Sequence, residues 1–386
     1  MSRRASVALG AAGAAGFLLS CLLVAQGLRD SSLYSDVHVY AQYAGKMTNG
    51  AVPYRDFFDE YPPLAQPVFL LARVAGAAHY ALAFKALMAL CGIGALACTV
   101  AILRALHASV TRSVAAVAVV AAAPLLVGPI FLNAYDLWPA FLLSLALALL
   151  VFDRPLLAFG VLGAAVAAKF YPVAVLPIAL LYVERQLRRS ALLTFAGVVA
   201  LAHLPFLVLG PGGLKESYWL QAKRGLELNS VGGAFLLAFG DPKLGNEPPG
   251  SLNVLGGAAD AIAVVSSLLM LVAIAAVAVA FALSRRDSSA VVLAAAAAVA
   301  GFVAFNKVFS AQYVDWLVPL APLAGVAASG ATVVIFALTR AVFSHRVGIQ
   351  AGGDAVWLLL VRDACVVFLT VLLLAATTRH KDVTRY

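Results

Sequence analysis

The residues best suited to chemistry are carboxylates in the short stretch 33–63, which follows the first long apolar run. In a chain with only 18 acidic residues among 386, this stretch holds Asp36, Asp56, Asp59 and Glu60. A carboxylate that is held in place can accept a proton from an attacking hydroxyl group. Asp36, Tyr40 and Tyr43 are spaced to share one face of a short helix. The same spacing also fits an acid that simply caps a surface helix.

Isolated cations lie beside several of the later apolar runs. Lys169 ends an otherwise uncharged run, Arg224 lies in a long polar loop, and Lys307 begins a polar stretch. Such groups can bind the phosphate of a lipid. The alternatives are a lysine that reaches from a helix end towards headgroups, and a plain salt bridge between Arg224 and Glu227. The hydrogen-bonding side chains that accompany the two lysines are Tyr171, Ser310, Gln312 and Tyr313.

A second group of acids could serve the acceptor of a reaction. Asp59 and Glu60 precede Tyr61 and two prolines, which fix an extended turn before the next helix. They are candidates for acceptor binding or a metal contact, or else favourable charges at a helix N-terminus. Asp136 ends the turn 133–136 and joins them as a candidate. No His or Asp cluster has convincing metal spacing, so we expect no cofactor and keep a divalent metal as the alternative.

The composition places these residues in a membrane protein. The chain is 63% hydrophobic and 12% charged, with a mean hydropathy of +0.97. Its apolar runs repeatedly reach the roughly 20 residues that cross a bilayer. We therefore predict an all-α, polytopic helical membrane protein of eleven or twelve transmembrane helices. The formal charge of +9 gathers in short loops and indicates orientation rather than nucleic-acid binding. The four cysteines fall in apolar runs as packing residues.

Orientation follows from the basic residues before and between the runs. Arg3 and Arg4 precede the first span, and further arginines fill alternate loops, so the positive-inside rule places the N-terminus in the cytoplasm. A cleaved signal peptide is the less favoured reading of the first span. We place the spans near 6–26, 79–104, 112–130, 136–152, 155–170, 172–184, 190–209, 254–283, 289–305 and 355–376.

The stretch 313–343 decides between eleven and twelve spans. It fits one tilted helix, which agrees with basic residues at 340–346, or two short helices that turn at residues 328–330. The final basic tail, which begins at Arg379, is cytoplasmic only with twelve spans, so we favour twelve. In either count the loops at about 27–78 and 210–253 lie on the external side of one transmembrane domain that comprises residues 1–386. Most of the acids and the isolated cations therefore share one face of the membrane.

These motifs resemble glycosyltransferase family 87, which belongs to the membrane-embedded C superfamily and includes polyprenol-phosphate-mannose-dependent α-mannosyltransferases of actinobacteria. The resemblance runs from about residue 30 to 320, and the order of the motifs carries more weight than any one of them. The last sixty residues match only loosely. The segments that carry the resemblance are 34–40, 53–57, 60–63, 169–172, 224–230 and 307–313.

The resemblance implies a role for each motif. In such enzymes an aspartate just after the first span is the catalytic base, and Asp36 occupies that position. The motifs of Lys169 and Lys307 would hold the donor's phosphate, with Arg224 reaching in from the external loop. The expected partners are a polyprenyl-phosphate-sugar donor, a lipid-linked or glycan acceptor and membrane lipids. Mannose would be transferred with inversion at the outer face of the cell membrane.

Two alternatives stay open at this point. Another polyprenyl-phosphate sugar, such as arabinose, glucose or galactose, would serve the same chemistry. A transporter or flippase of lipid-linked substrates is the rival from another class. Transporters usually place ionisable groups near the midplane and show two similar halves. This sequence has nearly uncharged span centres, apart from Lys85 and Arg362, and no internal repeat.

Overall fold

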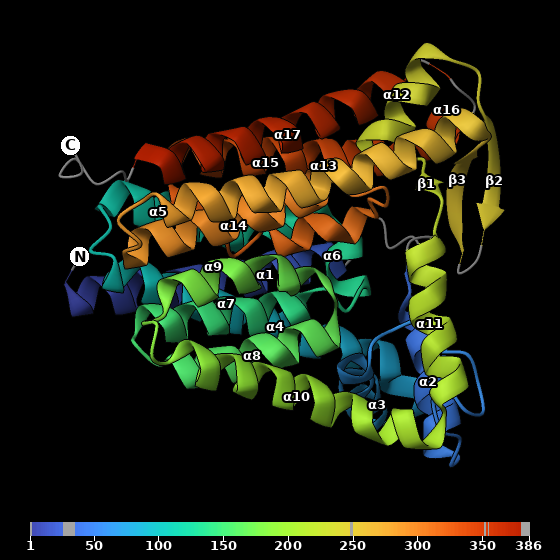
Figure 1. Ribbon diagram of the computed structural model, residues 1–386, viewed down its shortest axis with the longest axis horizontal. Coiled ribbons are helices and arrows are strands. Elements are labelled where there is room, and N and C mark those ends of the chain that lie inside the picture. The colour runs from blue at the N-terminus through green and yellow to red at the C-terminus, as the bar shows by residue number, and fades with distance from the viewer. Residues whose placement is uncertain (1, 26–34, 248–249, 351–352, 354, 380–386) are drawn as a thin grey trace.

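The structure is a computed structural model that describes residues 2–25, 35–247, 250–350, 353 and 355–379. Long helices run side by side along one direction and form a bundle, with α1 and α17 both reaching the same end of it (Figure 1). The helix ends and loops on that side carry most of the described arginines, and we call it the basic end. The opposite end carries short helices and a small sheet, and we call it the loop end.

Eight helices are long and apolar enough to cross a membrane, among the residues that the structure describes. They are α1 (Arg3–Ala25), α4 (Tyr80–Ala105, preceded by the 3-10 turn η3, Ala77–His79), α5 (Val110–Val127), α10 (Arg188–Leu209), α13 (Gly257–Ala282), α14 (Ser288–Phe305), α15 (Val326–Ser344) and α17 (Val356–Arg379). Three shorter apolar stretches lie between them, namely α7 (Leu137–Val151), α8 (Pro155–Ala168) and η4 with α9 (Tyr171–Val175 and Leu176–Tyr182).

One further crossing is not an α-helix. The chain from Ala311 to Ala324 runs as two 3-10 helices, η5 (Ala311–Trp316) and η6 (Ala321–Ala324). It begins beside Ser310, which contacts Glu227 at the loop end. It finishes near Leu323, whose carbonyl accepts a hydrogen bond of 2.7 Å from Nε of Arg112 at the basic end. At about 2 Å of rise per residue, such a segment is long enough to cross the bundle.

Within the described residues, the chain therefore passes between the two ends twelve times. The favoured count of twelve spans agrees with this arrangement, but the expected turn at residues 328–330 is wrong. The chain turns instead at Gly325, whose φ of +130° suits a glycine, and α15 runs unbroken through residues 328–330. The basic tail beyond Arg379 lies outside the described residues.

The loop end is more ordered than a sequence of external loops suggests. After α1 it holds α2 (Val37–Thr48), the 3-10 turn η2 (Pro63–Ala65) and α3 (Gln66–Arg73). After α10 it holds α11 (Pro211–Lys223), α12 (Val231–Phe239) and three antiparallel strands in the order β1 (Leu226–Glu227), β3 (Ser251–Leu255) and β2 (Lys243–Glu247). The short helices α6 (Ile130–Asn133) and α16 (Arg346–Gln350) complete it. The sheet was not predicted, since its strands are short and polar.

The core of the bundle is built on α14, in which every residue from Ala290 to Ala304 is buried. Twelve of its 18 residues are alanine or valine, so its neighbours α13 and α17 can approach closely. Small side chains at helix contacts are typical of membrane bundles, where close packing replaces the hydrophobic effect between helices. The helix ends at Phe305, and its packing fixes where the following Lys307 segment begins.

Candidate active site

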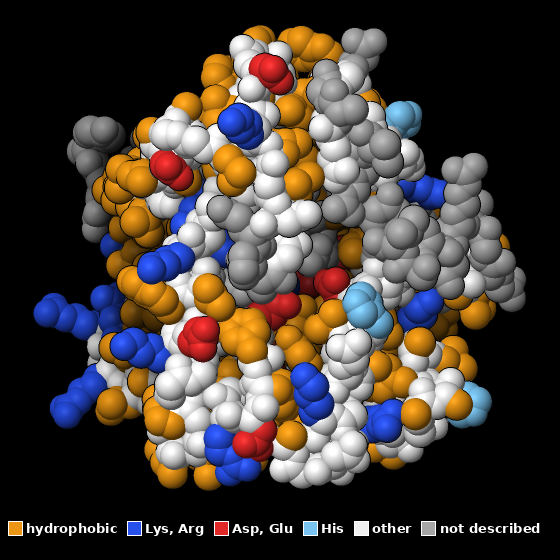
Figure 2. Space-filling model, turned by 90° about the vertical axis from the view of Figure 1, so that its right-hand side faces the viewer, with side chains coloured by type: hydrophobic (Ala, Val, Ile, Leu, Met, Phe, Trp, Pro, Cys, Tyr) orange, Lys and Arg blue, Asp and Glu red, His pale blue; other side chains and the backbone are white. Residues whose placement is uncertain are grey.

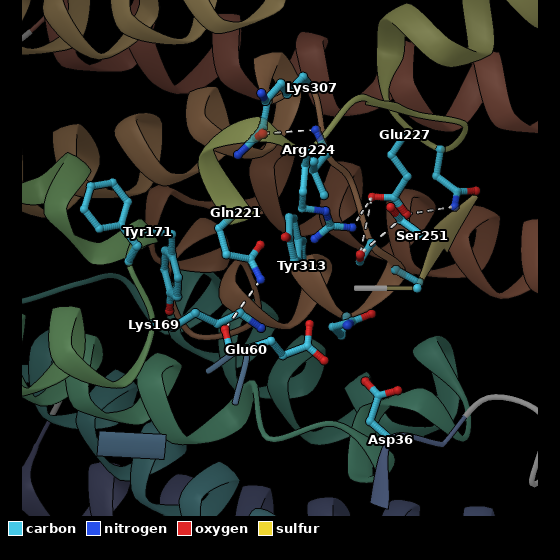
Figure 3. Close-up of a pocket in the computed structure, with 18 of the residues that line it drawn as sticks. Asp36, Glu60, Lys169, Tyr171, Gln221, Arg224, Glu227, Ser251, Lys307 and Tyr313 are labelled. Atoms are coloured by element: carbon cyan, nitrogen blue, oxygen red, sulfur yellow. Dashed lines mark hydrogen bonds and ion pairs between the residues drawn. The ribbon is translucent and has the colours of Figure 1, made fainter. Parts of the chain in front are cut away.

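A cavity of about 780 Å³ opens at the loop end of the bundle. Figure 2 looks onto this end and shows acidic side chains near its centre, among apolar and basic ones. Residues that are far apart in the sequence line the cavity, because α2, α8, α11, β1 and the segment that follows α14 meet there. Figure 3 shows how the labelled side chains lie around it.

Asp36 lies at the N-cap position of α2 and lines the cavity. Its carboxylate makes no capping hydrogen bond but accepts one of 3.4 Å from the hydroxyl of Tyr40, one turn further on. The backbone N–H of Asp36 donates to the carbonyl of Asn133 at 3.2 Å, which fixes its place against α6. Burial raises the pKa of Asp36, and so does the negative charge of Asp136. A raised pKa makes the ionised carboxylate a stronger base.

The expected face of Asp36, Tyr40 and Tyr43 exists, but it is buried rather than spread on a surface. Tyr40 is 1% exposed and stacks on Phe69 with ring centroids 4.4 Å apart. The rings of Tyr61 and Tyr135 meet it edge-on. This aromatic cluster holds α2 against α3 and the turn before α7. The position of Asp36 is therefore set by packing and not only by its own loop.

Glu60 and Asp59 are neighbours that point to different surroundings. Glu60 lines the cavity, and burial together with the charge of Asp36 raises its pKa to about 7, although Arg224 and Lys169 act in the opposite direction. Asp59 is fully buried and accepts a hydrogen bond of 3.0 Å from the N–H of Tyr61. Burial raises the pKa of Asp59 to about 7. Glu60 can therefore reach a substrate, whereas Asp59 supports the turn.

Lys169 is held at the point where α8 stops. It adopts an extended backbone conformation at the C-terminal cap, so its side chain leaves the helix and reaches the cavity. Its Nζ atom lies 2.5 Å from Oδ1 of Asp136 and over the ring of Tyr135, 4.6 Å from the centroid. Asp136 is fully buried, and Trp316 also donates to its Oδ1, at 2.7 Å. Asp136 is thus the partner of Lys169 and does not line the cavity.

Three aromatic rings form the wall behind Lys169. Tyr171 stacks on Trp316 with centroids 3.9 Å apart, and Trp316 stacks on Tyr313 at 4.0 Å. All three line the cavity, as does Gln312. The Nζ atom of Lys169 lies 5.4 Å and 5.5 Å from the ring centroids of Trp316 and Tyr313. Electron-rich ring faces around an ammonium stabilise its charge in a partly dry site.

Arg224 and Lys307 approach the cavity from the opposite wall, at the top of Figure 3. Arg224 follows α11 and lies 3.7 Å from Oε2 of Glu227, so the salt bridge that the sequence left as an alternative is present. Glu227 also accepts a hydrogen bond of 3.4 Å from the hydroxyl of Ser310. Lys307 donates to the carbonyl of Ala222 at 2.9 Å, and no described carboxylate forms an ion pair with it. Burial lowers the pKa of Lys307, and the charge of Arg224 adds to the effect.

Most of the residues singled out in the sequence meet at this one cavity. Eleven of them line it, namely Asp36, Glu60, Tyr61, Lys169, Tyr171, Arg224, Glu227, Lys307, Ser310, Gln312 and Tyr313. The structure does not bring Asp59 or Asp136 to the lining. Asp56 is half exposed and pairs with Arg55 at 2.8 Å, away from the cavity.

Several lining or supporting residues escaped the sequence analysis. Trp316 and Gln221 line the cavity, but no local pattern distinguishes them from other membrane-interface residues. Asp315 is fully buried and its two carboxylate oxygens have no hydrogen-bond partner among the described residues. An acid in an apolar run was a usable signal for it. Among the described residues, no group of three or more His, Cys, Asp or Glu side chains is arranged to hold a metal ion.

The fold has a counterpart among solved structures. It is similar to the crystal structure of ArnT from Cupriavidus metallidurans bound to undecaprenyl phosphate, with a TM-score of 0.51 and 13% sequence identity. The match covers 98% of this chain and 78% of that chain. The architecture is therefore a polytopic helical membrane fold like that of ArnT. No protein-family model and no curated protein matches the sequence.

Proposed function

We propose that this protein is a membrane glycosyltransferase that moves a sugar from a polyprenyl-phosphate donor to a lipid-linked or glycan acceptor. The observation that carries the proposal is the cavity at the loop end, which a half-buried, hydrogen-bonded carboxylate and three cations line together. The likeness to a protein crystallised with undecaprenyl phosphate supports the donor class. A polyprenyl chain can stay in the bilayer while its phosphate reaches this end of the bundle.

The pairing of the cations supports a donor with one phosphate group. Lys169 is neutralised by Asp136, and Arg224 by Glu227, so Lys307 supplies the unpaired positive charge. Such a site matches the small charge of a monophosphate diester better than that of a diphosphate. The paired cations still donate hydrogen bonds to phosphate oxygens, and Arg224 can do so through two parallel donors. These residues would stabilise the leaving phosphate without a bound metal.

Asp36 is the proposed catalytic base. In the proposed step its carboxylate takes the proton of the acceptor hydroxyl while that oxygen attacks the anomeric carbon and the phosphate leaves. Direct displacement by one base inverts the configuration at that carbon. Glu60 lies between Asp36 and the cations, and we propose that it contacts the acceptor together with Tyr61. Asp136 acts through Lys169, since it does not reach the cavity.

Mannose is the sugar that we propose, with the motif resemblance to family 87 as its support. Arabinose, glucose and galactose are the alternative sugars. We also propose that the loop end faces the outside of the cell, because the arginines at the basic end favour a cytoplasmic location. The protein would then act at the external surface of the cell membrane.

The deciding experiment is transfer of radiolabelled mannose from polyprenyl-phosphate-mannose to membrane lipids by the purified protein. We expect transfer by the wild type and a loss of at least about 100-fold with Asp36→Asn, within the usual range for removal of a general base. The matched control is Asp56→Asn, which changes an exposed acid of the same loop that does not line the cavity. It should leave transfer unchanged.

Two results would overturn the proposal. Full transfer by Asp36→Asn would remove Asp36 as the base. Absence of transfer by the wild type with mannose, arabinose, glucose and galactose donors would reject the glycosyltransferase. Accumulation of a labelled lipid-linked substrate in proteoliposomes would in that case support the transporter.

A further inference from the structure

The ion pair Arg362–Asp363 lies inside α17, among apolar residues. Arg362 is 0% exposed and Asp363 is 1% exposed. The Nε atom of Arg362 donates to Oδ1 of Asp363 at 2.8 Å, and its Nη2 atom lies 2.6 Å from the same oxygen. Apolar residues of similar size would often serve stability as well as a buried pair does. An ionisable pair at such a place therefore points to a task other than packing.

The guanidinium of Arg362 contacts two separate segments that carry the cations of the cavity. Its Nη2 atom donates to the carbonyl of Asn229, in the segment that contains Arg224. Its central carbon lies 4.0 Å from the ring centroid of Phe309, in the segment that contains Lys307. Arg362 itself does not line the cavity. Arg362 therefore lies behind both cationic segments and contacts each of them.

The two segments have few other direct contacts with each other. The N–H of Glu227 donates to the carbonyl of Lys307 at 2.9 Å. Ser310 reaches the carboxylate of Glu227 at 3.4 Å. Both contacts lie at the edge of the cavity, whereas Arg362 is buried beneath them. A substrate that competes for Glu227 or Ser310 would leave the Arg362 contacts in place.

We propose that Arg362 is a positioning residue that holds the Arg224 segment and the Lys307 segment together, so that both cations converge on one anion. This inference rests on the proposed function, in which the anion is the donor's phosphate. Arginine suits the task because its planar fork binds a carbonyl and a carboxylate while its face stacks on an aromatic ring. A lysine at the same place keeps one charge but cannot make all three contacts.

Two variants test the role without leaving a charge buried alone. Arg362→Lys keeps a cation beside Asp363. The double variant Arg362→Met with Asp363→Leu removes both charges and keeps an apolar helix, which preserves folding in comparable cases. The matched control is Arg112→Met, because the guanidinium of Arg112 also binds a backbone carbonyl, that of Leu323, but at the basic end.

The first readout is the kinetics of sugar transfer. A misplacement of a binding group by about 1 Å can reduce catalytic efficiency by up to about 100-fold. We expect both Arg362 variants to raise the KM for the polyprenyl-phosphate donor roughly 10-fold or more, with kcat within about twofold of the wild type. A fold defect alone would lower the amount of active enzyme and leave KM unchanged. Arg112→Met should at most lower the amount of active enzyme and should leave the KM for the donor unchanged.

The second readout is hydrogen exchange of the backbone, which needs no substrate. The amides of segments 226–230 and 307–310 should exchange faster in both Arg362 variants and stay protected in Arg112→Met. Wild-type donor KM and wild-type exchange in a folded Arg362 variant would overturn the inference. If the wild type transfers no sugar, the proposed function fails, and the exchange experiment still decides whether Arg362 joins the two segments.

Discussion

The carboxyl group of Glu60 lies between the acidic and the basic parts of the cavity. Asp36 raises its pKa, while Arg224 and Lys169 lower it, and burial has the largest effect. The resulting pKa of about 7 lies in the working range of a cell. Glu60 is therefore uncharged below about pH 7 and negative above it. This single proton changes the net charge that the phosphate of the proposed donor would meet.

The first prediction concerns this proton. As the pH rises through 7, ionised Glu60 repels the donor's phosphate, and the KM for the donor should rise by roughly 10-fold, the equivalent of about 1.4 kcal/mol. Glu60→Gln stays uncharged, so its donor KM should remain low up to pH 8. Donor KM measured between pH 6 and pH 8.5 for both proteins checks this. An equal rise in the two proteins would assign the effect to another group.

The second prediction concerns Lys169 and its buried partner. Lys169→Met leaves the Asp136 carboxylate buried without its cation, which should cost about 3–5 kcal/mol of unfolding free energy and abolish transfer. Adding Asp136→Asn removes the stranded charge and keeps an acceptor for the indole N–H of Trp316, so thermal stability should recover. Transfer should stay lost, because no ammonium faces the cavity. Thermal melting and transfer assays of the single and double variants check both parts, and recovered transfer would refute a direct role for Lys169.

Among the elements, α11 has the most direct effect on the position of Arg224. It starts beside Tyr54, a non-glycine residue with a φ of +63°. The chain passes so close to the Tyr54 backbone at Gly210 and Gly213 that a Cβ atom at either place would collide with it. The hydroxyl of Tyr54 donates to the carbonyl of Tyr61, which adjoins Glu60. The loop before α3 and the start of α11 therefore form one unit.

A pair of neighbouring glycines tests this unit. Gly213→Ala places a methyl group against the Tyr54 backbone, so it should cost about 1–3 kcal/mol of stability and raise the donor KM through a shift of Arg224. Gly212→Ala meets nothing within 4 Å and should behave as the wild type in both respects. Thermal melting and donor kinetics compare the two variants. Equal behaviour of both would show that α11 tolerates the shift.

The sequence predicted the helices well because long apolar runs leave little choice in a membrane. It also identified eleven residues of the cavity, since a charged group beside an apolar run is conspicuous. It could not predict that the Asp136 side chain pairs with Lys169 and does not line the cavity. Such a pairing between the start of α7 and the end of α8 depends on tertiary packing. The sheet and α11 were missed for a related reason. The sequences of the strands and of α11 are polar and show no long hydrophobic pattern. These elements are ordered mainly by contact with the bundle.

For the whole molecule, the side of the membrane on which the cavity opens can be measured directly. Asp56 lies on the loop end and Arg185 on the basic end, both at exposed positions. In intact cells a membrane-impermeant maleimide should label Asp56→Cys but not Arg185→Cys, and broken cells should allow both. The four native cysteines lie within the bundle helices, and the wild type serves as the background control. Labelling of Arg185→Cys alone would place the cavity in the cytoplasm.

The 3-10 segment between Ala311 and Ala324 determines whether the chain crosses the bundle an even or an odd number of times. With it, the start of α1 and the end of α17 lie on one side, so the number of crossings is even. Without it, α15 would run in the opposite direction and Arg362 would move away from Asn229 and Phe309. This stretch is easily overlooked when spans are counted by hydropathy. It nevertheless decides that the last helix, α17, begins at the loop end, near the site. The cavity-lining residues Val342 and Ile349 of α15 and α16 also owe their place at the loop end to this segment.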